Sequence, residues 1–177
     1  MAAWQEKKQT FGWQMVEIPG RGFRRVVPSP EPVEVFEQDI IRKILGLGII
    51  VIAVGGGGIP VIEKENYLVL GAEAVIDKDR ASSMLAVGLK ADLFIISTEA
   101  DYVYVDFKKP TQRALTKTNV SELEQYYNEK QFPAGSMGPK VESAIRFIQA
   151  GGKHVIITSY PHLLEAVQGN AGTHIVS

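Results

Sequence analysis

Beyond residue 33 the hydrophobic positions follow two alternating patterns. Residues 33–47 carry apolar side chains at helical spacing, and Gly46 and Gly48 stand where such a helix would end. The uninterrupted apolar run 49–54 then predicts a strand buried on both faces, as parallel strands are. Strands separated by helices predict an α/β fold, a three-layer sandwich with a mostly parallel sheet. Further strands are predicted at 67–75, 93–96, 102–105, 154–158 and 173–176, and helices at 81–89, 120–129, 141–150 and 161–167.

The first 32 residues follow a different pattern. A short helix is predicted at 3–11, followed by two short strands on either side of a turn at Gly20 and Gly22. Prolines at positions 28, 30 and 32 exclude a helix in the next segment. We therefore predict two parts, residues 1–32 and an α/β domain at 33–177.

Composition and charge narrow the class of protein. The 177 residues are 45% hydrophobic and 22% charged, which is typical of a globular protein with a core. The formal net charge of -1 provides no basic field for a nucleic-acid backbone or an anionic membrane, so we expect neither as a partner. Any polyanion that the chain binds must be small and held locally.

The absence of cysteine excludes disulfide scaffolds, cysteine-ligated metal centres and a cysteine nucleophile. It also fits a reducing compartment. The longest apolar run, 47–54, is far shorter than the ~20 residues that cross a bilayer, and the first residues lack the apolar segment of a signal peptide. We therefore predict a cytoplasmic location.

Four consecutive glycines follow the apolar run 49–54. Residues without side chains at the carboxyl end of a predicted strand let backbone amides approach an anion, at the edge where open α/β sheets bind ligands. A tight turn is the alternative interpretation, although a turn needs fewer glycines. The segment matches no nucleotide-binding fingerprint, because Pro60 stands where a dinucleotide motif requires glycine. The four residues are Gly55, Gly56, Gly57 and Gly58.

A second glycine-rich segment precedes the helix predicted at 141–150. Pro139 suits the first helical position, which would place Lys140 in the first turn. Free backbone N–H groups, the helix dipole and the lysine charge would then favour a phosphate at one place. The alternative is an exposed lysine after a loop, but a lysine at a helix start opposes the dipole. The residues before Pro139 are Gly135, Ser136, Met137 and Gly138.

The acidic and basic residues Asp77, Lys78 and Asp79 precede the helix predicted at 81–89. One interpretation makes Asp79 the N-cap of that helix and Lys78 an exposed bystander. The other holds Lys78 between two carboxylates as a charge-neutralising group for phosphoryl transfer. The local sequence leaves both interpretations open.

Other polar and aromatic residues carry weaker signals. The three histidines, His154, His162 and His174, lack metal-ligand spacing and are interpreted as edge or surface residues. The alternation around Tyr102 and Tyr104 favours a half-buried strand over a ring that stacks on a base.

Four segments in this order closely resemble carbamate kinases of the amino acid kinase family. They are 26–30 (VVPSP), 53–61 (AVGGGGIPV), 74–79 (AVIDKD) and 135–140 (GSMGPK). They extend through most of the chain, which resembles only the C-terminal part, somewhat more than half, of a family member.

The resemblance implies an amino acid kinase fold in which ATP and carbamate exchange a phosphoryl group reversibly with ADP and carbamoyl phosphate. It implies that Lys78 and Lys140 neutralise the transferring phosphoryl group and that Asp79 orients both lysines. The four glycines would border the substrate, and magnesium would be held through the nucleotide phosphates, with no metal-ligand motif in this sequence. The nucleotide would lie near Ser97, Thr98, Asp101, Val103, Tyr104, Gly135, Ser136, Met137 and Lys140.

The sequence departs from the family pattern at its beginning. Family members carry a Gly-Gly-Asn segment near their N-terminus and a further lysine in a projecting subdomain, and neither is matched here. Residues 1–32 resemble the end of that subdomain, so the first strands of the family sheet are missing. We therefore expect little or no activity from this chain alone, and a homodimer or a pairing with a separately encoded N-terminal half.

Two other functions stay open. The chain could be a nucleotide-binding or interaction module without catalysis, either a remnant or one half of a split kinase. An aspartate- or glutamate-type kinase is disfavoured, because the lysine in the segment 77–79 resembles the carbamate branch.

Overall fold

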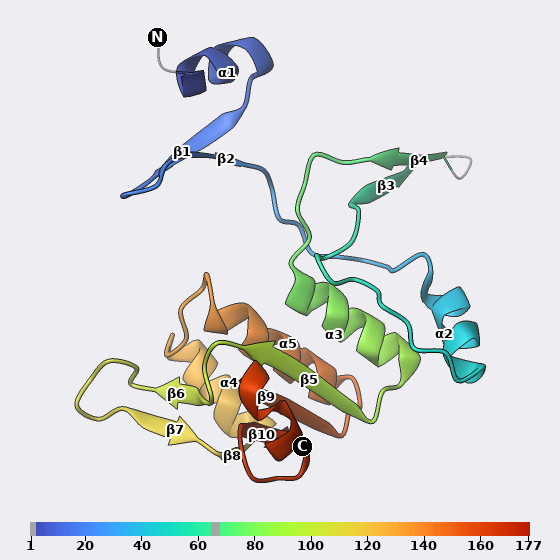
Figure 1. Ribbon diagram of the computed structural model, residues 1–177, viewed down its shortest axis with the longest axis vertical. Helices are drawn as coiled ribbons and strands as arrows, with labels where there is room; N and C mark the ends of the chain where they lie inside the picture. Colours follow the sequence, from blue (N-terminus) through green and yellow to red (C-terminus); the bar gives the residue numbers. More distant parts are fainter. Residues whose placement is uncertain (1–2, 65–67) are drawn as a thin grey trace. The chain divides into compact units, whose positions relative to one another are not determined.

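The computed structural model describes residues 3–64 and 68–177. The chain divides into two compact units (Figure 1). The smaller unit comprises Met1–Pro30 and Ile59–Ile76, and the larger comprises Glu31–Gly58 and Asp77–Ser177. The assignment of residues 1–32 to the end of a projecting subdomain stays a prediction.

The smaller unit consists of a helix and two hairpins. Helix α1 (Ala3–Phe11) has the predicted bounds and precedes the antiparallel strands β1 (Gln14–Ile18) and β2 (Gly22–Val26). The second hairpin pairs β3 (Val61–Lys64) with β4 (Leu68–Gly71). The strand predicted at 67–75 is thus confirmed only for its first part; Tyr67 lies outside the described residues, and 72–75 form no strand.

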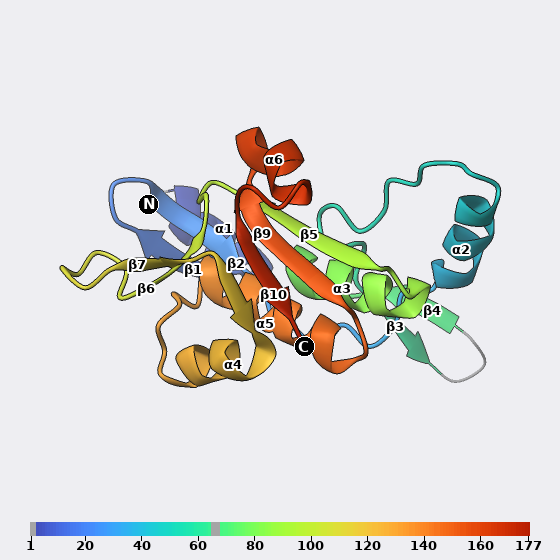
Figure 2. The same cartoon turned by 90° about the horizontal axis from the view of Figure 1, so that it is seen from below.

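A four-stranded sheet organises the larger unit (Figure 2). Its order is β5 (Leu93–Thr98), β9 (His154–Ser159), β10 (Thr173–Val176) and β8 (Lys117–Asn119). The β5–β9 and β10–β8 pairs are parallel, and the β9–β10 pair is antiparallel. The predicted, mostly parallel α/β sheet is therefore confirmed.

Helices lie on both faces of this sheet. Figure 2 shows α4 (Val120–Asn128) and α5 (Met137–Gln149) on one side and α6 (Leu163–Val167) on the other. Helix α3 (Lys78–Leu89) packs beside α5 and also contacts α2 (Gln38–Gly46). A short hairpin of β6 (Val103–Val105) and β7 (Arg113–Leu115) extends from the same unit.

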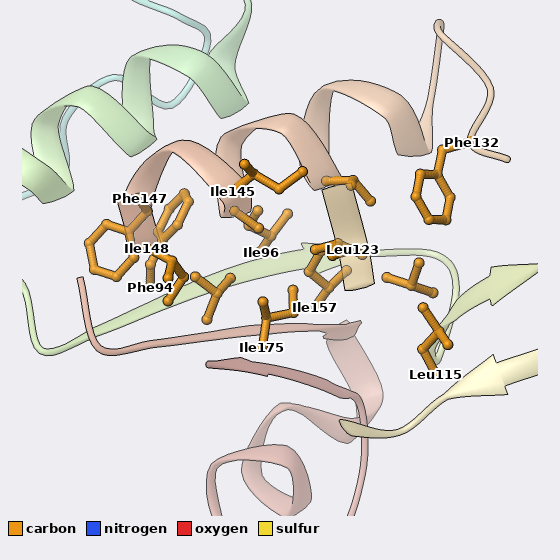
Figure 3. Close-up of a cluster of buried hydrophobic side chains, with 14 of the residues drawn as sticks. Phe94, Ile96, Leu115, Leu123, Phe132, Ile145, Phe147, Ile148, Ile157 and Ile175 are labelled. Carbon is orange, nitrogen blue, oxygen red and sulfur yellow. The ribbon is translucent and has the colours of Figure 1, made fainter. Parts of the chain in front are cut away.

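The core lies between α4, α5 and the sheet (Figure 3). Phe147 of α5 meets Phe94 of β5 with ring centroids 5.4 Å apart. Ile157 of the central strand β9 is fully buried. Burial of such side chains supplies the main stabilising free energy of the unit, about 1.5–3 kcal/mol for each.

The strand predicted at 49–54 is absent, and this is the largest error of the sequence analysis. Ile50 is 91% exposed and Ile52 is 97% exposed. Because a strand forms only where its backbone N–H and C=O groups find a neighbouring strand, apolar composition alone does not produce one. In the part of the chain that the structure describes, no strand pairs with this run.

The helix predicted at 33–47 is also shorter than expected, since α2 begins at Gln38. Val33 is 92% exposed, so the first apolar residues of that pattern have no surface to pack on. Helices α3 and α5 instead begin earlier than predicted, at Lys78 and Met137. Their first turns carry the charged residues of the candidate site.

Candidate functional site

Asp77 caps the N-terminus of α3. Its Oδ1 accepts hydrogen bonds from the backbone N–H groups of Asp79, at 2.9 Å, and Arg80, at 3.1 Å. Asp77 has the extended backbone that N-cap residues adopt (φ -66°, ψ 128°). The interpretation of Asp79 as the cap is therefore wrong, and the carboxylate of Asp79 is available for contacts outside its own helix.

Asp79 brings the two predicted lysines together. Its Oδ2 lies 2.9 Å from Nζ of Lys140 and 3.3 Å from Nζ of Lys78. Asp79 and Lys140 are buried, whereas the Lys78 side chain is 54% exposed. A buried carboxylate between two ammonium groups leaves this cluster with one excess positive charge. The alternative in which Lys78 lies between Asp77 and Asp79 is not observed, because Asp77 is used by the helix cap.

Helices α3 and α5 are parallel neighbours. Asp79 pairs with Lys140, and four residues further along α3 the Ser83 hydroxyl donates to the carbonyl of Ser143 at 2.9 Å. Both helices thus advance in the same direction, and their N-terminal turns lie side by side. Each N-terminus carries the partial positive charge of its helix dipole. Two helix N-termini, the ammonium groups of Lys78 and Lys140 and the carboxylate of Asp79 therefore lie together at one end of this helix pair.

The start of α5 differs from the sequence prediction. The helix begins at Met137, which makes Pro139 its third residue rather than its first. The missing N–H of proline is tolerated there because the first four amides of a helix have no intrahelical acceptor. The N–H of Gly138 bonds instead to the carbonyl of Pro133 at 2.9 Å. A Cβ at Gly138 would lie 3.0 Å from that carbonyl oxygen, so a larger residue would require the Pro133 carbonyl to move by a few tenths of an ångström.

A second ionic network stabilises the same helix pair. Arg80 of α3 bonds to Glu142 of α5 at 2.8 Å and also pairs with Glu31. Arg146 bonds to Glu31 at 2.6 Å and to Glu142 at 2.7 Å. The hydrogen bond from Arg146 holds the pKa of the Glu31 carboxyl below its usual range. These contacts were not predicted, since all but the Arg146–Glu142 pair join residues far apart in the sequence.

A cavity of about 190 Å³ lies between the two helices, beside this network. Ser83, Met84 and Val87 of α3 form part of its lining. Neither Lys78 nor Lys140 contributes to it. The charged cluster is therefore not part of this cavity.

The carboxyl ends of β5 and β9 carry a third polar cluster. Thr98 of β5 is paired in register with Ser159 of β9. The Ser159 hydroxyl donates to Oδ1 of Asp101 at 2.6 Å and lies 3.0 Å from Nδ1 of His162. The Ser159 hydrogen bond, and secondarily His162, hold the pKa of Asp101 below its usual value. Asp101 belongs to the predicted nucleotide region.

Sequence analysis missed Ser159 and interpreted His162 as a surface residue. The sequence does carry a signal for both residues, because Ser159 and His162 follow directly after an apolar strand. Among the other predicted nucleotide residues, Val103 is fully buried and Tyr104 is partly buried. The half-buried strand predicted around Tyr102 and Tyr104 is thus confirmed.

The four glycines form a turn rather than the end of a strand. The N–H of Gly57 bonds to the carbonyl of Val54 at 2.9 Å, and Gly57 and Gly58 have φ values of 97° and 88°. Only glycine adopts such angles without strain. Within residues 3–64 and 68–177, no hydrogen bond, ion pair or ring contact joins this turn to Lys78 or Lys140. The role of the glycines in substrate binding stays a prediction.

His154 and His174 pair across β9 and β10. Nε2 of His154 lies 3.0 Å from Nδ1 of His174, and the two rings stack. Burial, and secondarily His174, lower the pKa of His154. In the described residues, no three histidine, aspartate or glutamate side chains form a group that could hold a metal ion. No helix in that part of the chain is long and apolar enough to cross a membrane.

Comparison with known proteins gives consistent matches. The sequence profile of the amino acid kinase family matches residues 2–159. A carbamate kinase of Thermoplasma volcanium is 52% identical over 93% of this chain, and one of Thermococcus kodakarensis is 48% identical over 93%. The chain covers only 53% and 52% of those two proteins, so it spans about half the length of these curated relatives.

A solved structure agrees with the sequence matches. Carbamate kinase from Giardia lamblia bound to AMP-PNP superimposes with a TM-score of 0.90 and 41% identity. The match covers 98% of this chain and 55% of that protein. The observed α/β arrangement therefore corresponds to part of a larger fold.

Proposed function

Because the chain belongs to the amino acid kinase family, we propose that it is the nucleotide-binding, C-terminal portion of a carbamate kinase. In the proposed reaction, a carbamate oxygen forms a bond to the γ-phosphorus of ATP. The bond from that phosphorus to the β,γ-bridging oxygen breaks, and ADP and carbamoyl phosphate leave. The reverse reaction yields ATP.

The arrangement of Lys78, Asp79 and Lys140 carries this proposal. Phosphoryl transfer depends mainly on positioning and on neutralising the charge of the moving group. Two ammonium groups at the adjacent N-termini of α3 and α5 provide that charge, and their shared contact with Asp79 fixes their positions. Lys140 is buried, so its interaction with a bound phosphoryl group would be less screened by water.

The topology supports a nucleotide site at the same edge of the sheet. Helix α3 leads into β5 and helix α5 leads into β9 after short loops, so each helix runs antiparallel to its strand. The helix N-termini and the strand carboxyl ends therefore share one edge, where α/β sheets bind ligands. We assign nucleotide contacts there to Ser97, Thr98, Asp101, Val103, Tyr104, Gly135, Ser136, Met137 and Lys140.

Further parts of the proposal rest on resemblance. The glycines 55–58 would border the substrate. The described residues do not form a magnesium site of their own, so magnesium would enter with the nucleotide phosphates. A homodimer, a cytoplasmic location and the role of residues 1–32 stay predictions.

A module without catalysis is the second candidate. The exposed apolar run 49–54 favours it, because the chain alone leaves part of its apolar surface uncovered. Under either function the nucleotide site should bind, whereas only the kinase should transfer a phosphoryl group.

Nucleotide binding is tested by thermal unfolding with millimolar ADP or Mg-ATP. A ligand that binds only the folded chain adds about 2.7 kcal/mol at a hundredfold excess over Kd, so Tm should rise. Lys140→Met should remove most of the rise, since its ammonium group would contact the phosphates. Lys153→Met is the matched control, because Lys153 is exposed and pairs only with exposed Asp92 among its described contacts. A folded chain whose Tm does not respond to nucleotide would contradict the proposal.

A further inference from the structure

The carboxylate of Asp101 is held at one oxygen only. Its Oδ1 accepts a hydrogen bond from the Ser159 hydroxyl at 2.6 Å and lies 3.1 Å from Nδ1 of His162. In the part of the chain that the structure describes, no hydrogen bond or ion pair engages Oδ2. The side chain is 51% exposed, so one oxygen is fixed by the protein and the other can accept a hydrogen bond from a ligand.

The proton positions in this cluster follow from its donors and acceptors. The single hydroxyl proton of Ser159 is directed at Asp101, and an ionised carboxylate has no proton to give. The Ser159 hydrogen bond, and secondarily His162, lower the pKa of Asp101, which keeps the carboxylate ionised at neutral pH. Nδ1 of His162, 3.0 Å from the hydroxyl oxygen and 3.1 Å from Oδ1, therefore carries a proton and donates it toward these two oxygens. Ser159 and His162 thus both fix the orientation of the carboxylate.

The fold fixes the two donors in turn. Ser159 is the last residue of β9 and is 3% exposed, and its backbone is paired in register with Thr98 of β5. His162 ends the short 3-10 helix η2 (Tyr160–His162), which directly follows that strand. Asp101 lies in the bend after β5. Contacts from a neighbouring strand and helix therefore preorganise a carboxylate that a bend alone would leave free to change rotamer.

The open oxygen suits an uncharged hydroxyl donor better than a metal ion. Two donors already share the charge of this carboxylate, and within residues 3–64 and 68–177 no three histidine, aspartate or glutamate side chains form a group that could hold a metal ion. At the carboxyl edge of an α/β sheet, an acidic residue is a general means of accepting a hydrogen bond from a ribose hydroxyl. The ribose is the part of the proposed nucleotide that carries hydroxyl donors.

We propose that Asp101 binds the ribose hydroxyls of the nucleotide through its free carboxylate oxygen, and that Ser159 and His162 are positioning residues which orient that oxygen. Asp101 thereby makes the site selective for nucleotides that keep both ribose hydroxyls. The proposal rests on the proposed function, because it needs a nucleotide whose phosphates lie near Lys78 and Lys140. The two fail separately, since a chain that binds nucleotide without regard to the ribose hydroxyls contradicts this proposal alone.

The test compares two probes on the full 177-residue chain by isothermal titration calorimetry. ADP carries both ribose hydroxyls, and 2′,3′-dideoxy-ADP lacks them. A hydrogen bond to a charged group is worth at least about tenfold in affinity, so ADP should bind at least about tenfold more tightly. Equal affinities for the two probes would overturn the proposal and leave nucleotide binding intact. A chain that binds neither probe at millimolar concentration would overturn the proposed function, and this proposal with it.

Asp101→Asn should bring the affinity ratio of the two probes close to one. Ser159 would donate to the remaining oxygen, which leaves the amide nitrogen, a donor, at the position of Oδ2. The ratio is the measured quantity because a general loss of structure weakens both probes equally. Asp92→Asn is the matched control, since Asp92 precedes β5 at the other end of that strand, is exposed and pairs only with Lys153 among its described contacts. This control should keep the full ratio.

Variants of the positioning residues remove one donor each. Ser159→Ala and His162→Leu should each lower the ratio about threefold, through weaker binding of ADP. His162→Asn keeps an N–H donor near the position of Nδ1 and should restore the ratio. The His162 side chain is 44% exposed, so its variants should fold. An unchanged ratio in both donor-removing variants would overturn the proposal, and so would a parallel loss of affinity for both probes, which indicates a structural role only.

A third probe tests the other hydrogen-bond donor of the nucleotide. Inosine diphosphate keeps the ribose hydroxyls but has a carbonyl group in place of the amino group of adenine. Any preference of the unaltered chain for ADP over inosine diphosphate should be the same in Asp101→Asn. A preference that disappears in this variant would assign Asp101 to the base and overturn the proposal.

Discussion

Strand β9 and the run 49–54 are two apolar segments of the same unit with opposite outcomes. In β9, Val155, Ile156 and Ile157 are at most 1% exposed, whereas Ile50 and Ile52 are more than 90% exposed. Strand β9 lies between β5 and β10 and contacts α5, while the run has no paired strand among the described residues. Burial of apolar side chains is therefore favourable in both segments, but it occurs only where neighbouring strands and helices cover them.

The largest expected effect concerns the rate of ATP formation by this chain, in which the run 49–54 has no paired strand among the described residues. The chain alone should form ATP from ADP and carbamoyl phosphate at least about a thousandfold more slowly than a full-length relative. Losing one preorganised charged contact costs about 3 kcal/mol of transition-state stabilisation, and losing substrate orientation costs more. A coupled ATP assay on both proteins measures this difference. A comparable rate would show that the reaction does not need the part of the relatives that lies outside the match with this chain.

The second prediction concerns the buried ion pair between Asp79 of α3 and Lys140 of α5. Asp79→Ala should destabilise the chain by about 3 kcal/mol, because it leaves the buried ammonium of Lys140 without its partner. The double substitution Asp79→Ala with Lys140→Met should recover most of that loss, since it removes both charges. Urea unfolding at constant pH measures both variants. A double variant as unstable as the single one would mean that the ion pair is not the cause.

Much of the fold is predictable from local pattern. The strands expected at 93–96, 154–158 and 173–176 agree with β5, β9 and β10 to within two residues. Their neighbours lie within this chain, so pattern and tertiary context agree. The run 49–54 has an equally strong pattern without such neighbours, and the prediction failed there.

The candidate site is predictable only in part. A glycine-rich segment and a lysine at a helix start indicated Lys140, but its pairing with Asp79 was implied by resemblance rather than by spacing. Which aspartate caps α3 depends on backbone angles that the sequence leaves open. The contact of Asp101 with Ser159 depends on the register of β5 and β9, which local sequence does not reveal.

The third prediction compares Ile157 of strand β9 with Ile52 of the run 49–54. Ile157→Ala should lower the free energy of unfolding by about 2–5 kcal/mol, because it leaves a cavity in a fully packed strand. Ile52→Ala should change it by less than about 0.5 kcal/mol, as expected for an exposed residue. Urea unfolding curves of both variants give the two values. A large loss for Ile52→Ala in the chain alone would indicate that the run is buried in solution.

The smallest expected effect is a pH dependence of the free energy of unfolding that arises at His154 of β9. Burial and the neighbouring His174 lower the pKa of His154 below its ordinary value of 6.5. As the pH falls below 6.5, the unfolded chain therefore binds a proton before the folded chain does, and stability decreases. Above that pH both states are neutral at this position, so no change is expected there. The loss ends once the pH has passed below the folded-state pKa.

Two substitutions separate the causes of this pH dependence. His154→Gln should remove its contribution to the acid-side slope, whereas His174→Gln should reduce the slope without abolishing it, because burial is the larger cause. Urea unfolding between pH 5 and pH 8, in steps of about half a unit around the ordinary histidine pKa, measures the slope.

Hydrogen exchange should show the acid effect at the paired ends of β9 and β10, where the rings stack. Exchange at residues 49–53 should carry no such component, since these backbone groups are already unpaired at neutral pH. An acid-side slope that persists unchanged in His154→Gln would assign the effect to other groups.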